Sequence, residues 1–214
     1  HTFSVFIIKM TFTVHDYREG RLKQLTNELE LIAQAKQGET DAFRKLFEAY
    51  KVPVFNFVLR MIGGVQDAED VLQEVFVKMY QKLPTLRESQ YFSAWLFRVA
   101  KNESINYLHK HRRKKVNSID DYEPGFMEKV MAETRDAHHN PGREAEQVEL
   151  EQKLQTALNE LPESVRATFI LGVIEGQSYK EVAKILNCSI NNVKTRVFRA
   201  RTLLNKKLRS YLQA

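Results

Sequence analysis

The sequence predicts an all-α protein in which two small helical domains are joined by a flexible acidic linker, the second domain containing a helix-turn-helix. From about residue 26, apolar residues recur every three or four positions, which is typical of amphipathic helices. Residues 116–147 lack such a period and contain two Pro-Gly pairs. A structureless stretch of that length is unusual inside one compact domain and therefore indicates two domains.

The first domain is expected to span residues 26–115, after an N-terminal extension (residues 1–25) that is expected to be disordered. Its helices are expected at about residues 28–37, 42–61, from 67 or 70 to 80, and from 89–93 to 111. Pro53 lies inside the second of these and is expected to kink or break it, because proline lacks an amide donor. Gly63 and Gly64 should end that helix.

The second domain is expected to span residues 148–214. Its predicted helices cover about residues 148–161, 164–173 after Pro162, 179–186, and a last helix that follows Ser189. Asn187 and Cys188 separate the last two helices, and Asn tolerates the left-handed backbone of a tight turn. Ser189 is placed to cap the final helix.

Charge is distributed unevenly around a formal net charge of +6. Residues 98–115 carry seven basic side chains and one acid, and residues 189–212 carry seven basic side chains and no acid. Residues 116–151, between them, hold ten acids and three bases. Two basic regions separated by an acidic connector favour an anionic partner such as nucleic acid.

The chain contains one cysteine, Cys188, so it cannot form an internal disulfide. A reducing, cytoplasmic location is therefore expected. No apolar run approaches the roughly 18–20 residues that a membrane span requires, so no membrane insertion is expected. The sequence shows no phosphate-binding glycine loop, catalytic triad or metal-ligand spacing, so neither an enzyme nor a cofactor is expected.

The most informative stretch is residues 178–204, which predicts a helix-turn-helix whose second helix is basic. That helix should bury Val193, Val197, Ala200 and Leu204, at spacings of 4, 3 and 4. The same spacing turns Thr195, Phe198, Arg199 and Thr202 outward. Such a face suits the major groove of DNA, and the alternative interpretation is a solvated basic helix in a bundle.

Two further helices carry distinctive polar faces. In residues 67–80 the acids lie with Gln73 on the polar side, which would repel phosphate and so favours a protein partner, or else is a solvated face. In residues 92–115 one stripe contains Asn102, Asn106, Lys110 and Arg113, which could meet phosphates and bases together.

Three segments, taken in this order, resemble the extracytoplasmic-function sigma factors, the two-domain promoter-specificity subunits of bacterial RNA polymerase. They are DAEDVLQEVFVKMY (67–80), FSAWLFRVAKNESINYLHKHRRKK (92–115) and LPESVRATFILGVIEGQSYKEVAKILNCSINNVKTRVFRAR (161–201). The resemblance covers about residues 28–212.

The resemblance implies three binding surfaces and no catalysis. The first docks on the clamp coiled coil of the largest polymerase subunit through Asp70, Gln73, Glu74 and Phe76. The second binds and melts the −10 element through Leu86, Arg87, Asn102, Asn106, Lys110 and Arg113, with Ser89 in the same loop, and captures an unpaired base. The third places Lys194, Thr195, Arg196, Phe198 and Arg199 in the −35 major groove. An anti-sigma factor is a further partner that the family implies.

The linker is long enough to bridge two promoter elements but would rarely do so unaided. Sites one and a half to two turns apart are separated by roughly 50–70 Å, from ~34–36 Å per turn. A free coil of the linker's length averages about 30 Å end to end. We therefore expect polymerase to hold the domains apart and the isolated chain to bind promoters weakly. The alternatives are a dimeric helix-turn-helix regulator of palindromic DNA and a nuclease.

Overall fold

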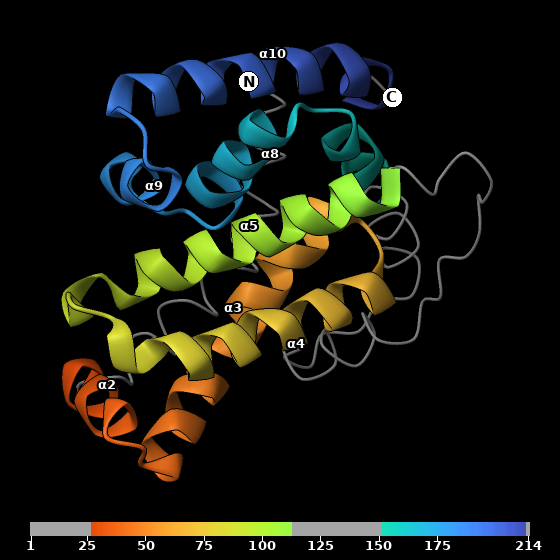
Figure 1. The fold of residues 1–214 in the computed structure, drawn as a ribbon. Coiled ribbons are helices and arrows are strands. Elements are labelled where there is room, and N and C mark those ends of the chain that lie inside the picture. Colours follow the sequence, from red (N-terminus) through yellow and green to blue (C-terminus); the bar gives the residue numbers. More distant parts are fainter. Residues whose placement is uncertain (1–26, 113–150, 213–214) are drawn as a thin grey trace, which may run out of the picture.

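The computed structural model describes residues 27–112 and 151–212, and nearly all of them lie in helices (Figure 1). Within these two ranges there is no strand, so the all-α prediction is confirmed. The expected disordered extension, both linker boundaries and Arg113 lie outside the described residues.

The first half of the molecule, residues 27–112, is built around three long helices that pack on one another. Its elements are α2 (Glu28–Lys36), α3 (Thr40–Ile62), α4 (Val65–Lys82), the 3₁₀ turns η1 (Leu83–Thr85) and η2 (Ser89–Tyr91), and α5 (Phe92–Arg112). Leu46 and Phe57 of α3, Met79 of α4 and Leu96 of α5 have no exposed surface. The rings of Phe57 and Phe97 meet edge to face with centroids 5.8 Å apart.

Helix α3 continues through Pro53, so of the two expected outcomes, a kink or a break, the break is wrong. The residues around the proline explain this outcome. Tyr50, Val54 and Phe57 are all buried on one side of the helix. Their packing outweighs the loss of one backbone hydrogen bond. The helix ends where expected, at Gly63, whose φ of 96° is a conformation that glycine adopts readily.

The second half, residues 151–212, contains the helix-turn-helix. Its elements are a helix at residues 151–159, α8 (Glu163–Phe169), the π-helical turn η3 (Ile170–Ile174), α9 (Tyr179–Leu186) and α10 (Ile190–Leu212). The sequence predicted one regular helix over residues 164–173. Instead the amide of Glu175 donates to the carbonyl of Ile170, five residues earlier, at 2.8 Å. The wider turn belongs to a buried apolar run and was not visible in the periodicity.

The two halves are packed against each other in this structure. Figure 1 shows α5 lying between the other helices of the first half and the layer formed by α8 and α9. Contacts join α5 to α9 and α3 to both α8 and η3, and the buried apolar residues form one continuous cluster. The sequence predicted two modules but contained no signal for this contact.

Replacing Phe57 by alanine should lower the free energy of unfolding by about 3–5 kcal/mol, because the ring is fully buried and leaves a cavity. Phe198, whose side chain is 74% exposed, provides the matched control. Phe198→Ala should change the free energy by less than about 0.5 kcal/mol. Urea unfolding followed by circular dichroism measures both. Equal losses in the two variants would contradict the assignment of the core.

Candidate nucleic-acid interface

The helix-turn-helix is fixed by hydrogen bonds at each junction. The Ser178 hydroxyl accepts from the Glu181 amide at 3.2 Å, and the Glu181 carboxylate accepts from the Ser178 amide at 2.9 Å, which forms a capping box. Asn187 ends α9 with φ 50° and ψ 54°, the left-handed conformation that the sequence predicted. The Asn192 amide donates to the Ser189 hydroxyl at 3.2 Å, so Ser189 caps α10 as expected.

Helix α10 divides into a buried apolar side and an exposed polar side. Its inner residues are at most 3% exposed, namely Val193, Val197, Ala200 and Leu204. Lys194, Thr195, Phe198 and Arg199 are all exposed, and Arg196 is half-buried. The Arg196 guanidinium lies 3.9 Å from the Cys188 sulfur, which directs it toward the turn. The burial pattern predicted for this helix is therefore confirmed, and its free side offers cations, a hydroxyl and an aromatic ring.

Helix α5 presents the second polar surface. Asn102, Asn106 and Lys110 are exposed, so the described part of the predicted stripe faces outward. On the opposite side Ser104 is fully buried, and its hydroxyl donates to the Ala100 carbonyl at 2.8 Å. An ion pair of 2.5 Å between Lys78 and Glu103 ties α5 to α4.

The loop before α5 is anchored at one residue and free at the next. Leu86 is half-buried, and its carbonyl accepts from the Lys36 ammonium of α2 at 2.6 Å. Arg87 is exposed. Among the predicted −10 residues, Leu86 therefore positions the loop, and Arg87 is free to reach a ligand.

Helix α4 carries the acidic surface. Asp70, Gln73 and Glu74 are exposed as expected. Phe76 is only 6% exposed, and its ring packs on Phe47 with centroids 4.5 Å apart. As placed, Phe76 supports the helix from inside and leaves little surface exposed, and its contact with a partner stays a prediction.

Comparison with known proteins decides the family. Residues 46–114 match the model of Sigma-70 region 2, and residues 151–204 match the model of Sigma-70, region 4. The ECF sigma factor SigW of Bacillus subtilis is 32% identical over 180 residues, covering 83% of this chain and 95% of its own. The ECF sigma-E factor of Escherichia coli K12 is 32% identical over 197 residues, covering 89% and 98%. The chain belongs to the ECF sigma factors.

Solved structures agree with this sigma factor fold. The structure of CnrH in complex with the cytosolic domain of CnrY is similar with a TM-score of 0.62, at 25% identity over 86% of this chain and 97% of that one. The fold of the sigma factor RpoE from Bartonella quintana is also similar, with a TM-score of 0.59 at 24% identity over 78% and 96%. We refer below to residues 27–112 as the region 2 half and to residues 151–212 as the region 4 half.

Two exposed apolar residues of the sigma factor extend the acidic surface of α4. Val77 is 50% exposed and Tyr80 is 68% exposed, and they follow Gln73 at intervals of four and three along the helix. The Tyr80 ring meets Phe43 edge to face at 5.2 Å, which holds it at the surface. Sequence analysis assigned no role to these two positions. The spacing from Gln73 was the signal that could have identified them.

Asp67 is turned toward α5 by Tyr107. The Tyr107 hydroxyl is hydrogen-bonded to the Asp67 carboxylate. Partial burial, this hydrogen bond and the charges of Asp67 and Asp70 all raise the pKa of Tyr107. The phenol therefore stays protonated and continues to donate, which separates Asp67 from the outward acids of α4.

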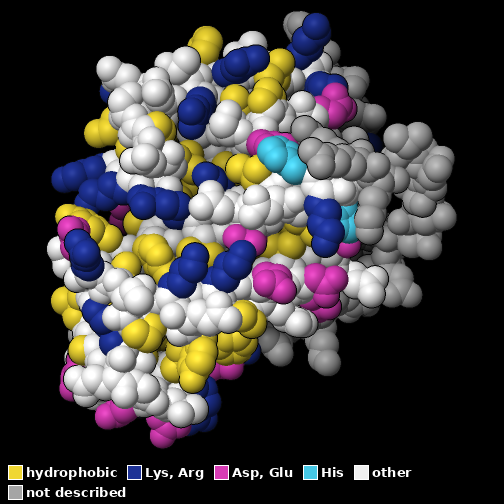
Figure 2. Space-filling model, in the orientation of Figure 1, with side chains coloured by type: hydrophobic (Ala, Val, Ile, Leu, Met, Phe, Trp, Pro, Cys, Tyr) yellow, Lys and Arg dark blue, Asp and Glu magenta, His cyan; other side chains and the backbone are white. Residues whose placement is uncertain are grey.

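Several cations collect where α5 meets α9, and Figure 2 shows Lys and Arg side chains gathered there. Burial lowers the pKa of Lys101, and the positive charges of Arg98 and Arg196 lower it further. The Lys184 ammonium lies 4.3 Å from the centre of the Tyr91 ring. These residues come from α5, η2, α9 and α10, so only the packing of the two halves brings them together. Sequence analysis could not have found this cluster.

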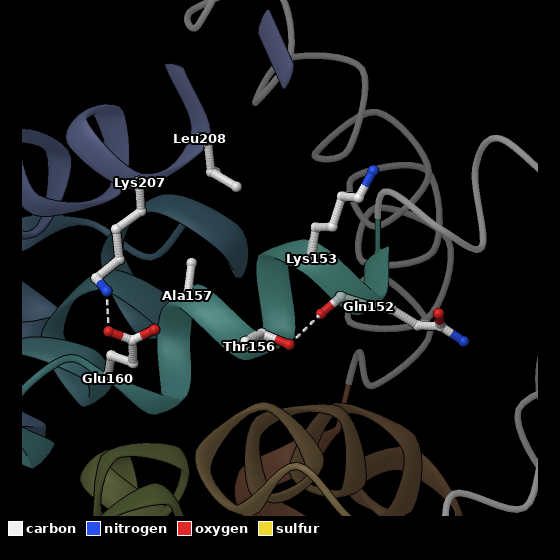
Figure 3. Close-up of a pocket in the computed structure, with 7 residues that line it drawn as sticks. All are labelled: Gln152, Lys153, Thr156, Ala157, Glu160, Lys207 and Leu208. Atoms are coloured by element: carbon white, nitrogen blue, oxygen red, sulfur yellow. Dashed lines mark hydrogen bonds and ion pairs between the residues drawn. The ribbon is translucent and has the colours of Figure 1, made fainter. Parts of the chain in front are cut away.

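The sigma factor also has a cavity of about 450 Å³ between the helix at residues 151–159 and α10 (Figure 3). Glu160 and Lys207 form an ion pair across it, and the Thr156 hydroxyl donates to the Gln152 carbonyl at 2.9 Å. The remaining lining is Lys153, Ala157 and Leu208. This set provides no nucleophile beside a base, so the cavity does not indicate catalysis.

Within the described ranges, no group of three or more His, Cys, Asp or Glu residues is arranged to hold a metal ion. The helices described here also include none whose length and apolar character would suffice for a membrane span.

The left-handed turn between α9 and α10 gives a direct test. Asn187→Gly should leave the free energy of unfolding nearly unchanged, because glycine adopts this conformation freely. Asn187→Val should lower it by roughly 1–2 kcal/mol, because a β-branched residue clashes there. Thermal unfolding of the two variants compares them. If valine is tolerated as well as glycine, the turn is not formed as described.

Proposed function

We propose that this chain directs bacterial core RNA polymerase to promoters by binding the −10 and −35 elements, and that it promotes DNA melting at the −10 element in the cytoplasm. One observation carries the proposal: a single chain exposes an acidic face on α4 and two separate polar, cation-bearing faces on α5 and α10. Two nucleic-acid surfaces and one protein surface are the minimum that such a subunit requires.

The protein surface that we propose for core polymerase consists of Asp70, Gln73, Glu74, Val77 and Tyr80. Acids at this position would repel phosphate, so they suit a protein partner with basic groups. Exposed Val77 and Tyr80 would add apolar contact area beside the charges. Tyr residues are enriched at interface centres because they bury much surface at low entropic cost.

The surface that we propose for the −35 element is the outer side of α10. Arg199 and Lys194 provide donors for base edges or phosphates, and arginine is the commonest reader of guanine. The exposed ring of Phe198 suits contact with a thymine methyl group. Thr195 donates to the Asn191 carbonyl at 3.0 Å and keeps its oxygen available as an acceptor.

The surface that we propose for the −10 element combines the α5 stripe with the loop at Arg87. Cations along a groove and amide or aromatic groups that meet unpaired bases are the usual means of holding single strands. Asn102, Asn106 and Lys110 supply the amides and a cation, and Tyr91, 41% exposed, supplies a ring. Capture of an unpaired base by this surface would favour the open duplex.

An anti-sigma factor is a further partner that we propose for this chain. The similar protein CnrH was solved in complex with the cytosolic domain of another protein, CnrY. The packed arrangement of the two halves gives such a partner one continuous surface to contact.

Transcription in vitro tests the proposal. The full chain should direct core polymerase to defined start sites on a library of linear bacterial DNA fragments, and no defined transcripts should appear without it. Tight binding to a palindrome in the absence of polymerase would instead support a dimeric regulator. DNA cleavage by the chain alone would support a nuclease.

Arg199→Ala should reduce the preference for the −35 element by about tenfold or more, because a bidentate arginine contact discriminates by ~1–3 kcal/mol. Its affinity for core polymerase should not change. Arg201→Ala is the matched control, since it should weaken binding to all DNA sequences alike. Competition between matched and scrambled −35 sequences measures both. Equal loss of preference in the two variants would refute the proposed reading role of Arg199.

Gln73→Ala combined with Glu74→Ala should weaken binding to core polymerase by about tenfold or more, as expected for residues near the centre of an interface. The matched control is Gln37→Ala combined with Glu39→Ala, at two positions exposed on the connection between α2 and α3. Fluorescence anisotropy of the labelled chain titrated with core polymerase measures the affinities. Unchanged affinity in the first variant would place the polymerase contact elsewhere.

A further inference from the structure

Region 2 contributes a cation to the end of a helix in region 4. The Arg98 guanidinium on α5 donates from Nε to the Ile185 carbonyl at 3.2 Å and from a terminal nitrogen to the Lys184 carbonyl. Both acceptors lie at the C-terminal end of α9, where a helix runs out of its own amide donors, and the Lys184 carbonyl also accepts from the Asn187 amide at 3.4 Å. This end of a helix also carries partial negative charge. Arg98 therefore holds two oxygens of an electronegative site.

Region 4 in turn contributes donors to the C-terminal end of a helix in region 2. Arg166 of α8 is 2% exposed and donates to the Met61 carbonyl at 2.6 Å, and Gln155 donates to the Arg60 carbonyl at 3.1 Å. These carbonyls close the C-terminal end of α3. A hydrogen-bond contact of 3.0 Å between His109 Nε2 and a Glu163 carboxylate oxygen also crosses the contact. The closed arrangement thus rests on polar bonds between the halves as well as on apolar packing.

Arg98 begins the polar stripe of α5. It lies one turn before Asn102, and Asn106 and Lys110 follow at the same interval of four. The neighbouring Lys101 is partly exposed on the same side of the contact. A guanidinium fork that accommodates two carbonyl oxygens has the geometry to accommodate two phosphate oxygens.

The cations of this cluster have no acidic counterpart in the described part of the chain. No ion pair there joins Arg98, Lys101, Lys184 or Arg196 to a carboxylate. The α9 carbonyls provide only partial negative charge to offset them. Among the described residues the cluster is therefore poorly neutralised, and a full anion would neutralise it better.

We propose that Arg98 and Lys101 form a phosphate-binding surface that α9 occupies in the free chain, with the carbonyls of Lys184 and Ile185 in the place of phosphate oxygens. The proposal rests on the proposed function, because the phosphates are those of promoter DNA next to the α5 stripe. Binding of DNA by Arg98 and closure of the two halves then exclude each other. Arg98 is exposed in the closed form, but its Nε and one terminal nitrogen are engaged by α9, and a polymerase that separates the halves would release these donors for phosphate.

The first experiment measures closure in the full chain without DNA. Donor and acceptor dyes are placed through Lys45→Cys and Thr202→Cys, both exposed positions in opposite halves, in a Cys188→Ser background. Arg98→Ala should raise the ratio of open to closed molecules about tenfold or more, since hydrogen bonds from a charged group are lost. Arg98→Lys should also open the chain, because an ammonium cannot form the same fork. Arg44→Ala, which removes an exposed arginine of α3, should have no effect.

The second experiment measures phosphate binding with the full chain bound to core polymerase. The probe is a short duplex of mixed sequence with an unpaired central bubble. Arg98→Ala and Lys101→Ala should each reduce the slope of log affinity against log salt by about 1, whereas Arg98→Lys should retain the slope because it keeps the charge.

The outcomes separate the parts of the proposal. A chain that opens in Arg98→Ala with an unchanged salt slope would show that Arg98 only joins the halves, which overturns the phosphate assignment. A reduced slope without opening would overturn the occupation by α9. Failure of the wild-type chain to direct polymerase to promoters would instead contradict the proposed function. The dye measurement would still report whether the two halves are closed.

Discussion

The C-terminal ends of helices organise the contact between the two halves of this sigma factor. Carbonyls at the end of α3 accept from Arg166 and Gln155, and carbonyls at the end of α9 accept from Arg98. Each of these donors comes from the other half, so contact between the halves adds to the local bonds that cap the two helix ends. The same contact brings like charges together around Lys101. Hydrogen bonds to the helix ends favour the closed arrangement, and repulsion among the cations around Lys101 opposes it. An anion or a partner protein can therefore shift the equilibrium between closed and open forms.

This balance connects the local structure to the proposed function. The reading side of α10 is exposed in the closed form, whereas Arg98 at the start of the α5 stripe is engaged with α9. In this form the proposed −35 surface is free, whereas two donor nitrogens of the exposed Arg98 side chain, in the proposed −10 surface, are bonded to α9. The acidic face of α4 lies outside the contact and remains available, so the chain can meet polymerase before it meets DNA. Such an order would limit unproductive binding by the free subunit.

How much could be predicted from the sequence depended on the range of the interactions involved. The helix-turn-helix followed from local rules, since apolar spacing, Ser189 and the left-handed Asn187 act within a few residues. The helix does not break at Pro53, one of the two outcomes expected there, because buried neighbours on the same helix outweigh one missing hydrogen bond. The outward positions of Val77 and Tyr80 depend on how α4 is rotated about its axis where it packs on α3. The cluster around Arg98 depends on a contact between segments more than 80 residues apart, for which one sequence contains no signal.

The account requires that the halves, closed in the free chain, separate on the promoter. The most direct measurement is the distance between dyes on exposed positions of α5 and α10 in the full chain, assembled with core polymerase on a promoter that it transcribes. The account predicts roughly 50–70 Å, the span of one and a half to two DNA turns at ~34–36 Å each. A distance unchanged from that in the free chain, in complexes that produce promoter-specific transcripts, would contradict it.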